Sequence, residues 1–263
     1  MTSTLTAREI SLSLTRPGRA FRRRVSTEIL HGVSLDVSPG SSLGLVGSSG
    51  SGKSTLLRTL LALETPDSGS VTLHGRIIRP GSLKSLRWFR REVQYVPQDP
   101  ASSLDPRLTV EQLLREPLVC LGVDGQHAAR IRDALGRVEL PAAASGRRPF
   151  ELSGGQNQRV AIARALVVSP AILLADELVS GLDLPLRNQV LDVLQMLISE
   201  QGLGVLFVSH DLDAIAALCA RTAVLADGRI VEEGPTGQIL NNPQHAMTRE
   251  LNAARLAQGA VVR

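Results

Sequence analysis

The chain has 263 residues, with 29 lysines and arginines against 25 aspartates and glutamates, and a formal net charge of +4. This mild charge, with one tryptophan and one tyrosine, provides no aromatic platform for single-stranded nucleic acid. No apolar run approaches the roughly 20 residues that span a bilayer, and we expect no signal peptide. Cys120 and Cys219 lack disulfide or metal-ligand spacing, so we expect two reduced thiols in a cytoplasmic protein.

One local cluster departs from this mild charge. Its members are Arg16, Arg19, Arg22, Arg23 and Arg24. Such a cluster can meet acidic lipid headgroups or nucleic acid, but a solvated loop is the more ordinary interpretation.

The first part of the chain is typical of β-strands. Residues 9–14 and 33–37 alternate apolar and polar side chains, as half-buried strands do. Residues 43–46 form an apolar run that is typical of a buried strand and leads into a glycine-rich loop. We expect a helix over residues 53–61 after this loop, and another strand over residues 93–96.

Helical character begins near residue 109. Thr109 can cap a helix that starts at Val110 and is interrupted near Pro117, and a second helix is expected over residues 126–136. The α/β pattern then resumes. It consists of strands over 171–175, 205–209 and 222–225 and helices over 186–199 and 211–219. The tail beyond Gly234 predicts one or two short helical segments, and the whole pattern predicts an α/β core with an inserted helical lobe.

Residues 47–54, Gly-Ser-Ser-Gly-Ser-Gly-Lys-Ser, match a phosphate-binding P-loop (Walker A). Glycines in such a loop let backbone N–H groups surround phosphate oxygens at a helix N-terminus. Lys53 is expected to reach the β- and γ-phosphates, Ser54 to ligate Mg²⁺, and Thr55 to add a phosphate contact. The expected strand and helix on either side distinguish this pattern from an ordinary Gly/Ser-rich turn. The predicted nucleotide-binding residues are Gly47, Ser48, Ser49, Gly50, Ser51, Gly52, Lys53, Ser54 and Thr55.

The apolar run at residues 171–175 ends in Asp176 and Glu177. A strand buried on both faces has this composition, and ligands of α/β proteins lie at the carboxyl ends of such strands. Asp176 is expected to hold Mg²⁺, directly or through water, and Glu177 to polarise the attacking water. Taken alone, the pair fits a helix cap equally well. The P-loop favours the catalytic interpretation.

A third motif, Leu-Ser-Gly-Gly-Gln, occupies residues 152–156. With the P-loop, it makes the chain resemble the ATP-binding cassette (ABC) ATPases over roughly residues 5–255. The resemblance implies a P-loop NTPase core, an antiparallel β-subdomain and an inserted helical lobe at about residues 100–165. It also implies one domain over residues 1–240 and a tail over 241–263. In this family the motif of one subunit closes over ATP held by another, so a second cassette, the same or a sister chain, is implied.

The resemblance assigns roles to several other residues. Ser153, Gly154, Gly155 and Gln156 would present a helix N-terminus to the γ-phosphate held by the partner, although Ser153 also fits a simple cap. Asp183 matches the D-loop, which lies across the interface between the two cassettes.

Gln98 and His210 are assigned by the same resemblance. Gln98 resembles the Q-loop glutamine, which contacts Mg²⁺ and the attacking water. His210 matches the switch histidine, which contacts the γ-phosphate. A lone glutamine or histidine in a loop is more often structural, so both roles depend on the family. The implied cofactors are ATP and Mg²⁺.

Residues 98–107, Gln-Asp-Pro-Ala-Ser-Ser-Leu-Asp-Pro-Arg, resemble the stretch after the Q-loop in importers of oligopeptides, dipeptides and nickel or other metal complexes. Further stretches of this kind are 148–151, 228–235 and 242–245. The resemblance implies a peripheral ATPase at the cytoplasmic face of the inner or plasma membrane. Its partners would be two membrane permease subunits and, indirectly, an extracytoplasmic solute-binding protein, with no nucleic acid. The alternative is a soluble ABC ATPase acting on nucleic acid, ribosomes or cofactor assembly, whereas a P-loop kinase leaves the third motif unexplained.

Some residues depart from the family pattern. Leu178 stands where a proline commonly follows the acidic pair, Gly181 replaces the usual D-loop alanine, and Pro97 replaces an aromatic residue. None of these changes removes a catalytic group. Because no cysteine follows Cys219, we expect no iron–sulfur cluster. In this family an aromatic residue normally stacks on adenine, and Phe21 is the only candidate for it before the P-loop.

Overall fold

The computed structural model describes residues 3–16 and 25–261, so Phe21 and most of the arginine cluster lie outside the described residues. The chain forms two compact units. The first contains residues 1–38, 43–81 and 209–263, and the second contains residues 39–42 and 82–208. Both combine strands with helices, so the predicted α/β class is confirmed.

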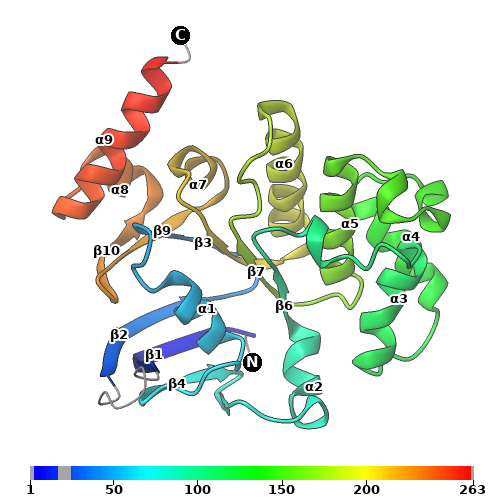
Figure 1. Cartoon of the computed structure of the whole chain (residues 1–263), viewed down its shortest axis with the longest axis horizontal. Helices are drawn as coiled ribbons and strands as arrows, with labels where there is room; N and C mark the ends of the chain where they lie inside the picture. Colours follow the sequence, from blue (N-terminus) through cyan, green and yellow to red (C-terminus); the bar gives the residue numbers. More distant parts are fainter. Residues whose placement is uncertain (1–2, 17–24, 262–263) are drawn as a thin grey trace. The chain divides into compact units, whose positions relative to one another are not determined.

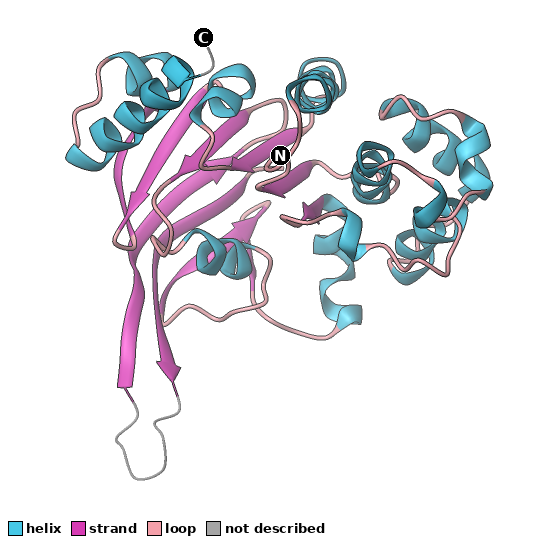
Figure 2. Cartoon of the chain, turned by 45° about the horizontal axis from the view of Figure 1, so that its top comes forward, coloured by secondary structure: helices cyan, strands magenta, loops and turns pink. Residues whose placement is uncertain are grey.

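The first unit contains a four-stranded antiparallel sheet in the order β2-β1-β4-β5. Its strands are β1 (Leu5–Arg16), β2 (Val25–Val37), β4 (Ser68–Leu73) and β5 (Arg76–Ile78). Figure 2 shows the long strands β1 and β2 side by side. β1 is longer than the predicted segment 9–14. A bulge between Ala7 and Ile10 shifts the alternation of apolar and polar side chains, so the residues before it do not continue the pattern. Glu9, which lies in this bulge, has φ +49°.

Among the described residues, the first unit also contains three further strands and four helices. β9 (Arg221–Ala226) pairs in parallel with β3 (Ser42–Val46) and antiparallel with β10 (Arg229–Pro235). The helices are α1 (Lys53–Leu60), α7 (Leu212–Leu218), α8 (Thr236–Asn241) and α9 (Ala246–Val261). Figure 1 shows α7, α8 and α9 grouped beside β9 and β10. α9 has 16 residues, so the prediction of only short helical segments in the tail is wrong for this helix.

The second unit contains a parallel group of strands. β7 (Ile172–Asp176) lies between β8 (Gly204–Val208) and β6 (Val93–Val96). β8 is buried throughout and β7 is buried up to its last residue, as their apolar composition predicts. Because the strands are parallel and in register, their carboxyl ends meet at one edge, where α/β proteins place ligands.

The helices of the second unit are α2 (Leu83–Glu92), α3 (Val110–Cys120), α4 (His127–Arg137), α5 (Gly154–Leu166) and α6 (Leu184–Gln201). α3, α4 and α5 contact one another and form the predicted helical lobe. Thr109 caps α3 in a capping box with Gln112, but the predicted interruption near Pro117 is wrong, because α3 runs through it. The neighbouring Leu114 and Leu118 are fully buried, and their packing outweighs the roughly 3 kcal/mol cost of an internal proline.

The two cysteines lie in different environments. Both are free; Cys120 is exposed and Cys219 is buried. Burial raises the pKa of the Cys219 thiol to about 12, so this thiol stays protonated at neutral pH. Within the described residues, no helix has the length and apolar character needed to cross a membrane.

Candidate nucleotide site

The predicted P-loop lies in the first unit, between the buried strand β3 and helix α1. The loop turns at Gly50 and Gly52, whose φ angles of +81° and +106° would strain any residue with a side chain. Gly52 occupies the N-cap of α1 and supplies no capping side chain. The helix N-terminus thus has no side-chain cap, which suits the binding of phosphate there.

The side chains of this loop add further hydrogen-bond donors. Lys53 bends back over it, and its Nζ donates to the carbonyl oxygens of Gly47 at 2.7 Å and Ser48 at 3.0 Å. Ser51 is 4% exposed, and its hydroxyl has no hydrogen-bond partner among the described residues. An ammonium group, uncapped helix N–H groups and an unpaired buried hydroxyl form a set of donors suited to phosphate oxygens.

Gly47 packs directly against the neighbouring strand, since a Cβ there would lie 2.2 Å from the backbone oxygen of Leu225. We expect Gly47→Ala to displace the loop from β9, to lower the free energy of unfolding by about 1–3 kcal/mol, and to weaken ATP binding. Thermal denaturation and ATP titration measure the two effects. The control is Gly136→Ala in α4, where a Cβ meets nothing within 4 Å and alanine favours the helix. Equal losses of stability in both variants would contradict the prediction.

His210 also lies in the first unit, at the end of β3 that leads into the P-loop. The N–H of Ser209 donates to the carbonyl of Leu45 in β3 at 3.2 Å. The hydroxyl of Ser209 accepts the N–H of Asp211 at 3.0 Å, and Asp211 caps α7. The exposed His210 is thus held between two anchored residues. This position suits a switch histidine, and its contact with the γ-phosphate stays a prediction.

The predicted acidic pair lies in the second unit, at the carboxyl end of β7. Asp176 is half-buried, and the hydroxyl of Tyr95 donates to its Oδ2 at 3.2 Å. Burial, followed by the charge and the hydrogen bond of Asp176, raises the pKa of Tyr95 to about 12, so this phenol stays protonated at neutral pH. The sequence alone gave no indication of this contact, because it depends on how the two strands pair.

Glu177 has a backbone conformation that is unusual for its residue type. Its φ is +47°, its exposed fraction is 9%, and its N–H donates to the carbonyl of Val208 at 2.8 Å. Strained residues of this kind cluster at functional sites. The alternative that the acidic pair caps a helix is wrong, because the next helix begins at Leu184 and Asp183 caps it.

The Leu-Ser-Gly-Gly-Gln motif begins helix α5. The hydroxyl of Ser153 accepts the N–H of Gln156 at 3.2 Å, and the side-chain oxygen of Gln156 accepts the N–H of Ser153 at 3.0 Å. The capping role considered for Ser153 is therefore present. Ser153 and Gly154 are nevertheless exposed, so the helix N-terminus is open to a ligand from outside the chain. A Cβ on Gly155 would lie 2.5 Å from Leu186, so this glycine permits close packing of α5 against α6.

The D-loop follows the acidic pair and leads into α6. Asp183 accepts the N–H of Leu186 at 3.0 Å as the N-cap of this helix. Gly181 has φ +75°, which gives a physical reason for glycine in place of the usual alanine. Leu178, in place of the usual proline, is fully buried and contributes to the core.

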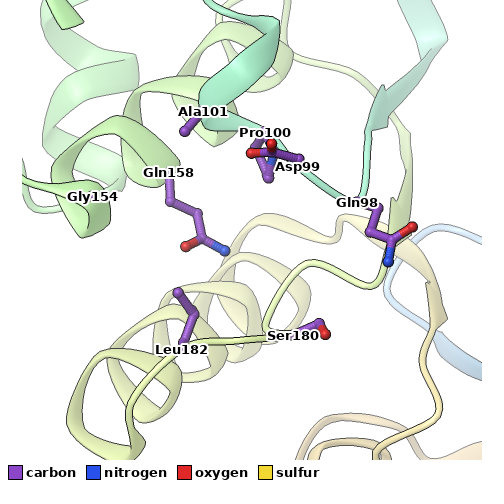
Figure 3. Close-up of a pocket in the computed structure, with 8 residues that line it drawn as sticks. All are labelled: Gln98, Asp99, Pro100, Ala101, Gly154, Gln158, Ser180 and Leu182. Atoms are coloured by element: carbon purple, nitrogen blue, oxygen red, sulfur yellow. The ribbon is translucent and has the colours of Figure 1, made fainter. Parts of the chain in front are cut away.

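A cavity of about 460 Å³ in the second unit joins three of the predicted motifs (Figure 3). Gln98, which is exposed, lies at one end of it and Gly154 at the other. Gln158 extends from α5 toward the D-loop and donates an amide hydrogen bond to the carbonyl of Leu178. The complete lining consists of Gln98, Asp99, Pro100, Ala101, Gly154, Gln158, Ser180 and Leu182. Sequence reasoning did not identify Gln158, since only tertiary packing brings it to this loop.

The predicted site residues therefore fall into two sets. The first unit holds residues 47–55 with His210, and the second holds Gln98, Asp176, Glu177, residues 153–156 and Asp183. Among the residues that the structure describes, no group of three or more His, Cys, Asp and Glu side chains could hold a metal ion.

Comparisons with known proteins agree with the motifs. The family described as "ABC transporter" matches residues 30–180. The glutathione import ATP-binding protein GsiA of Salmonella choleraesuis is 44% identical over 235 residues, covering 88% of this chain and 38% of the relative. A putative peptide import ATP-binding protein of Brucella ovis is 42% identical over 234 residues, covering 88% of this chain and 74% of the relative. The chain thus spans less than half the length of the first relative.

Two solved structures have a similar fold. The first is the dimeric structure of a post-hydrolysis state of the ATP-binding cassette MJ0796 bound to ADP and Pi. It is 28% identical with a TM-score of 0.76, covering 88% of this chain and 98% of that one. The second, cbiO1 from Clostridium perfringens, is part of the ABC transporter complex cbiONQ. It is 23% identical with a TM-score of 0.78, covering 100% of this chain and 99% of that one, and this likeness concerns the fold alone.

Proposed function

We propose that this chain, which belongs to the ABC transporter family, hydrolyses ATP to drive the import of peptides through separate membrane permeases. One observation carries this proposal. A P-loop with an uncapped helix N-terminus and a bent-back Lys53 occurs in the same chain as a Leu-Ser-Gly-Gly-Gln motif whose helix N-terminus is exposed. The cargo class is supported by the two relatives, which are named for the import of glutathione and of peptides.

ATP and Mg²⁺ are the proposed cofactors. Residues 47–55 bind the phosphates, and the donor set around Lys53 and Ser51 fits them. Oxygen atoms of Ser54, Gln98 and Asp176 are the proposed ligands of Mg²⁺, which prefers such hard donors and neutralises phosphate charge when bound. Glu177 orients the attacking water and accepts its proton.

The proposed cycle needs two cassettes. The exposed N-terminus of α5, with Ser153 and Gly154, would close over ATP held by the P-loop of a second cassette, the same or a sister chain. Asp183 would lie across that interface, and His210 would contact the γ-phosphate. The dimeric MJ0796 cassette supports this arrangement. ATP would shift the population toward the closed pair, because it adds binding energy mainly to that state.

Two membrane permease subunits are the proposed docking partners at the cytoplasmic face of the inner or plasma membrane. An extracytoplasmic solute-binding protein would deliver cargo to the permeases, so the cassette itself would not contact the solute. Nickel or other metal complexes are the second cargo class, supported only by the sequence resemblance around Gln98. No nucleic acid partner is proposed.

Affinity purification tests the proposal. Tagged chain carrying Glu177→Gln is incubated with ATP and detergent-solubilised membranes of the source cells, and its partners are identified by mass spectrometry. We expect two multi-span proteins, with or without a second cassette, and a weaker yield with Lys53→Ala as the control. Recovery of ribosomal or nucleic-acid-binding proteins alone would overturn the transport function in favour of a soluble ATPase.

Uptake measurements distinguish the two cargo classes. Cells whose chain carries Glu177→Gln are expected to lose uptake of a radiolabelled dipeptide while retaining uptake of radiolabelled nickel. The opposite result would assign the metal complexes as cargo. Unchanged uptake of both would contradict an importer of either class.

A further inference from the structure

Tyr95 occupies a defined position relative to the acidic pair. In the parallel ladder between β6 and β7, Tyr95 pairs with Leu174, and Val96 pairs with Ala175. Side chains two residues apart on a strand share a face, so Asp176 lies on the same face as Leu174 and diagonally beyond Tyr95. The phenol reaches the carboxylate for that reason, with 3.2 Å between its hydroxyl and Oδ2.

The strand pairing also explains why the orientation of the Asp176 carboxylate depends on such a contact. On the β8 side, Asp176 pairs with Val208, whereas the ladder with β6 ends one residue earlier, at Val96 and Ala175. Asp176 is followed directly by the left-handed Glu177, so it stands at the very end of regular strand structure. The hydroxyl of Tyr95 fixes one carboxylate oxygen there and thereby limits rotation of the side chain.

Tyr95 contributes a ring within the sheet and a hydroxyl that donates to Asp176. Because the acceptor is a carboxylate, the loss of this hydrogen bond in Tyr95→Phe acts directly on Asp176. A phenylalanine ring would fill nearly the same space in the sheet. The hydroxyl of Tyr95 therefore matters chiefly for the orientation of the carboxylate that it contacts.

We propose that Tyr95 is a positioning residue for Mg²⁺, and that its hydroxyl orients the carboxylate of Asp176 toward the metal. The inference rests on the proposed function, in which Asp176 is a metal ligand. Hydrogen bonds from neighbouring residues commonly orient such ligands, and their loss costs about 10- to 100-fold in metal affinity or activity.

The test measures metal binding without turnover. The wild-type chain and Tyr95→Phe are saturated with ADP and titrated with Mn²⁺, and the free ion is counted by electron paramagnetic resonance. We expect the dissociation constant for Mn²⁺ to rise about 10-fold in Tyr95→Phe. We also expect the ADP affinity in excess EDTA and the thermal midpoint to stay unchanged, which a merely destabilised protein would not show.

Two further variants complete the design. Thr222→Val removes a buried hydroxyl far along the chain, which hydrogen-bonds to Thr236, and is expected to leave Mn²⁺ affinity unchanged. Asp176→Asn is expected to weaken Mn²⁺ binding more than Tyr95→Phe does. If Asp176→Asn weakens binding but Tyr95→Phe matches the wild type within twofold, the role of Tyr95 is overturned. If Asp176→Asn also matches the wild type, the metal-binding part of the proposed function fails, and the inference fails with it.

Discussion

Replacement of Glu177 by glutamine is expected to lower the rate of ATP hydrolysis about 10²- to 10⁴-fold while leaving ATP bound. A glutamine has nearly the same shape and can keep hydrogen bonds that the carboxylate makes, but it cannot accept a proton from the attacking water. The left-handed conformation of Glu177 and its exposed fraction of 9% fit the proposed role, because strained residues cluster at functional sites. The variant should therefore separate nucleotide binding from chemistry.

Phosphate release and equilibrium ATP binding measure the two steps. Glu139→Gln is a closely matched control, because Glu139 is also a non-glycine residue with positive φ, at +55°, and its side chain is exposed. We expect this control to retain full activity. The catalytic role of Glu177 is refuted if Glu177→Gln keeps more than about a tenth of wild-type turnover. Loss of ATP binding in this variant would instead indicate a structural role.

Motifs built from consecutive residues could be predicted from the sequence, because local chemistry determines them. The P-loop helix was expected over residues 53–61 and occurs at Lys53–Leu60. Thr109 was recognised as a cap from its side chain alone, and Ser153 shows the same hydrogen-bonding pattern. In each case the signal lies within four residues, so no tertiary information is needed.

Several elements were not predicted, for different reasons. α2 carries the signals of a helix, because Ser82 caps it and Leu86 and Phe89 are buried three residues apart. Its lysine and arginines provide the polar residues of an amphipathic helix, so α2 could have been recognised from the sequence. β10 has no fully buried residue, and β5 has only three residues, so neither shows a clear alternation. These two strands form because β4 and β9 complete their hydrogen bonds.

Contacts set by strand register and helix packing could not be predicted at all. The hydrogen bond from Tyr95 to Asp176 joins residues 81 positions apart, and its geometry follows from a one-residue choice of register between β6 and β7. The hydrogen bond from Gln158 to Leu178 similarly depends on how α5 packs. Sequence motifs thus identified the groups proposed for chemistry, whereas the fold supplied the residues that hold them in place.

Lysine is rare in this chain, so the reactivity of the Lys53 amine can be measured with little background from other lysines. The sequence contains only two lysines, Lys53 and Lys84, among 29 lysines and arginines. Lys84 is the second residue of α2 and is exposed. It therefore serves as an internal control for Lys53, the first residue of α1. Arginine is a poor substitute for lysine in the P-loop, because its wide planar guanidinium group cannot act as a compact point charge.

Lys53→Ala is expected to weaken ATP binding about 10- to 100-fold, the equivalent of one charge-assisted hydrogen bond of roughly 1.5–3 kcal/mol. The fold should tolerate the change, since water can replace the ammonium at the carbonyls of Gly47 and Ser48. Lys84→Ala should bind ATP as the wild type does. Amine-reactive labelling of the wild-type chain, read by mass spectrometry, provides a direct measurement: bound ATP should protect Lys53 and leave Lys84 reactive. Equal labelling of Lys53 with and without saturating ATP would show that its ammonium does not contact the phosphates.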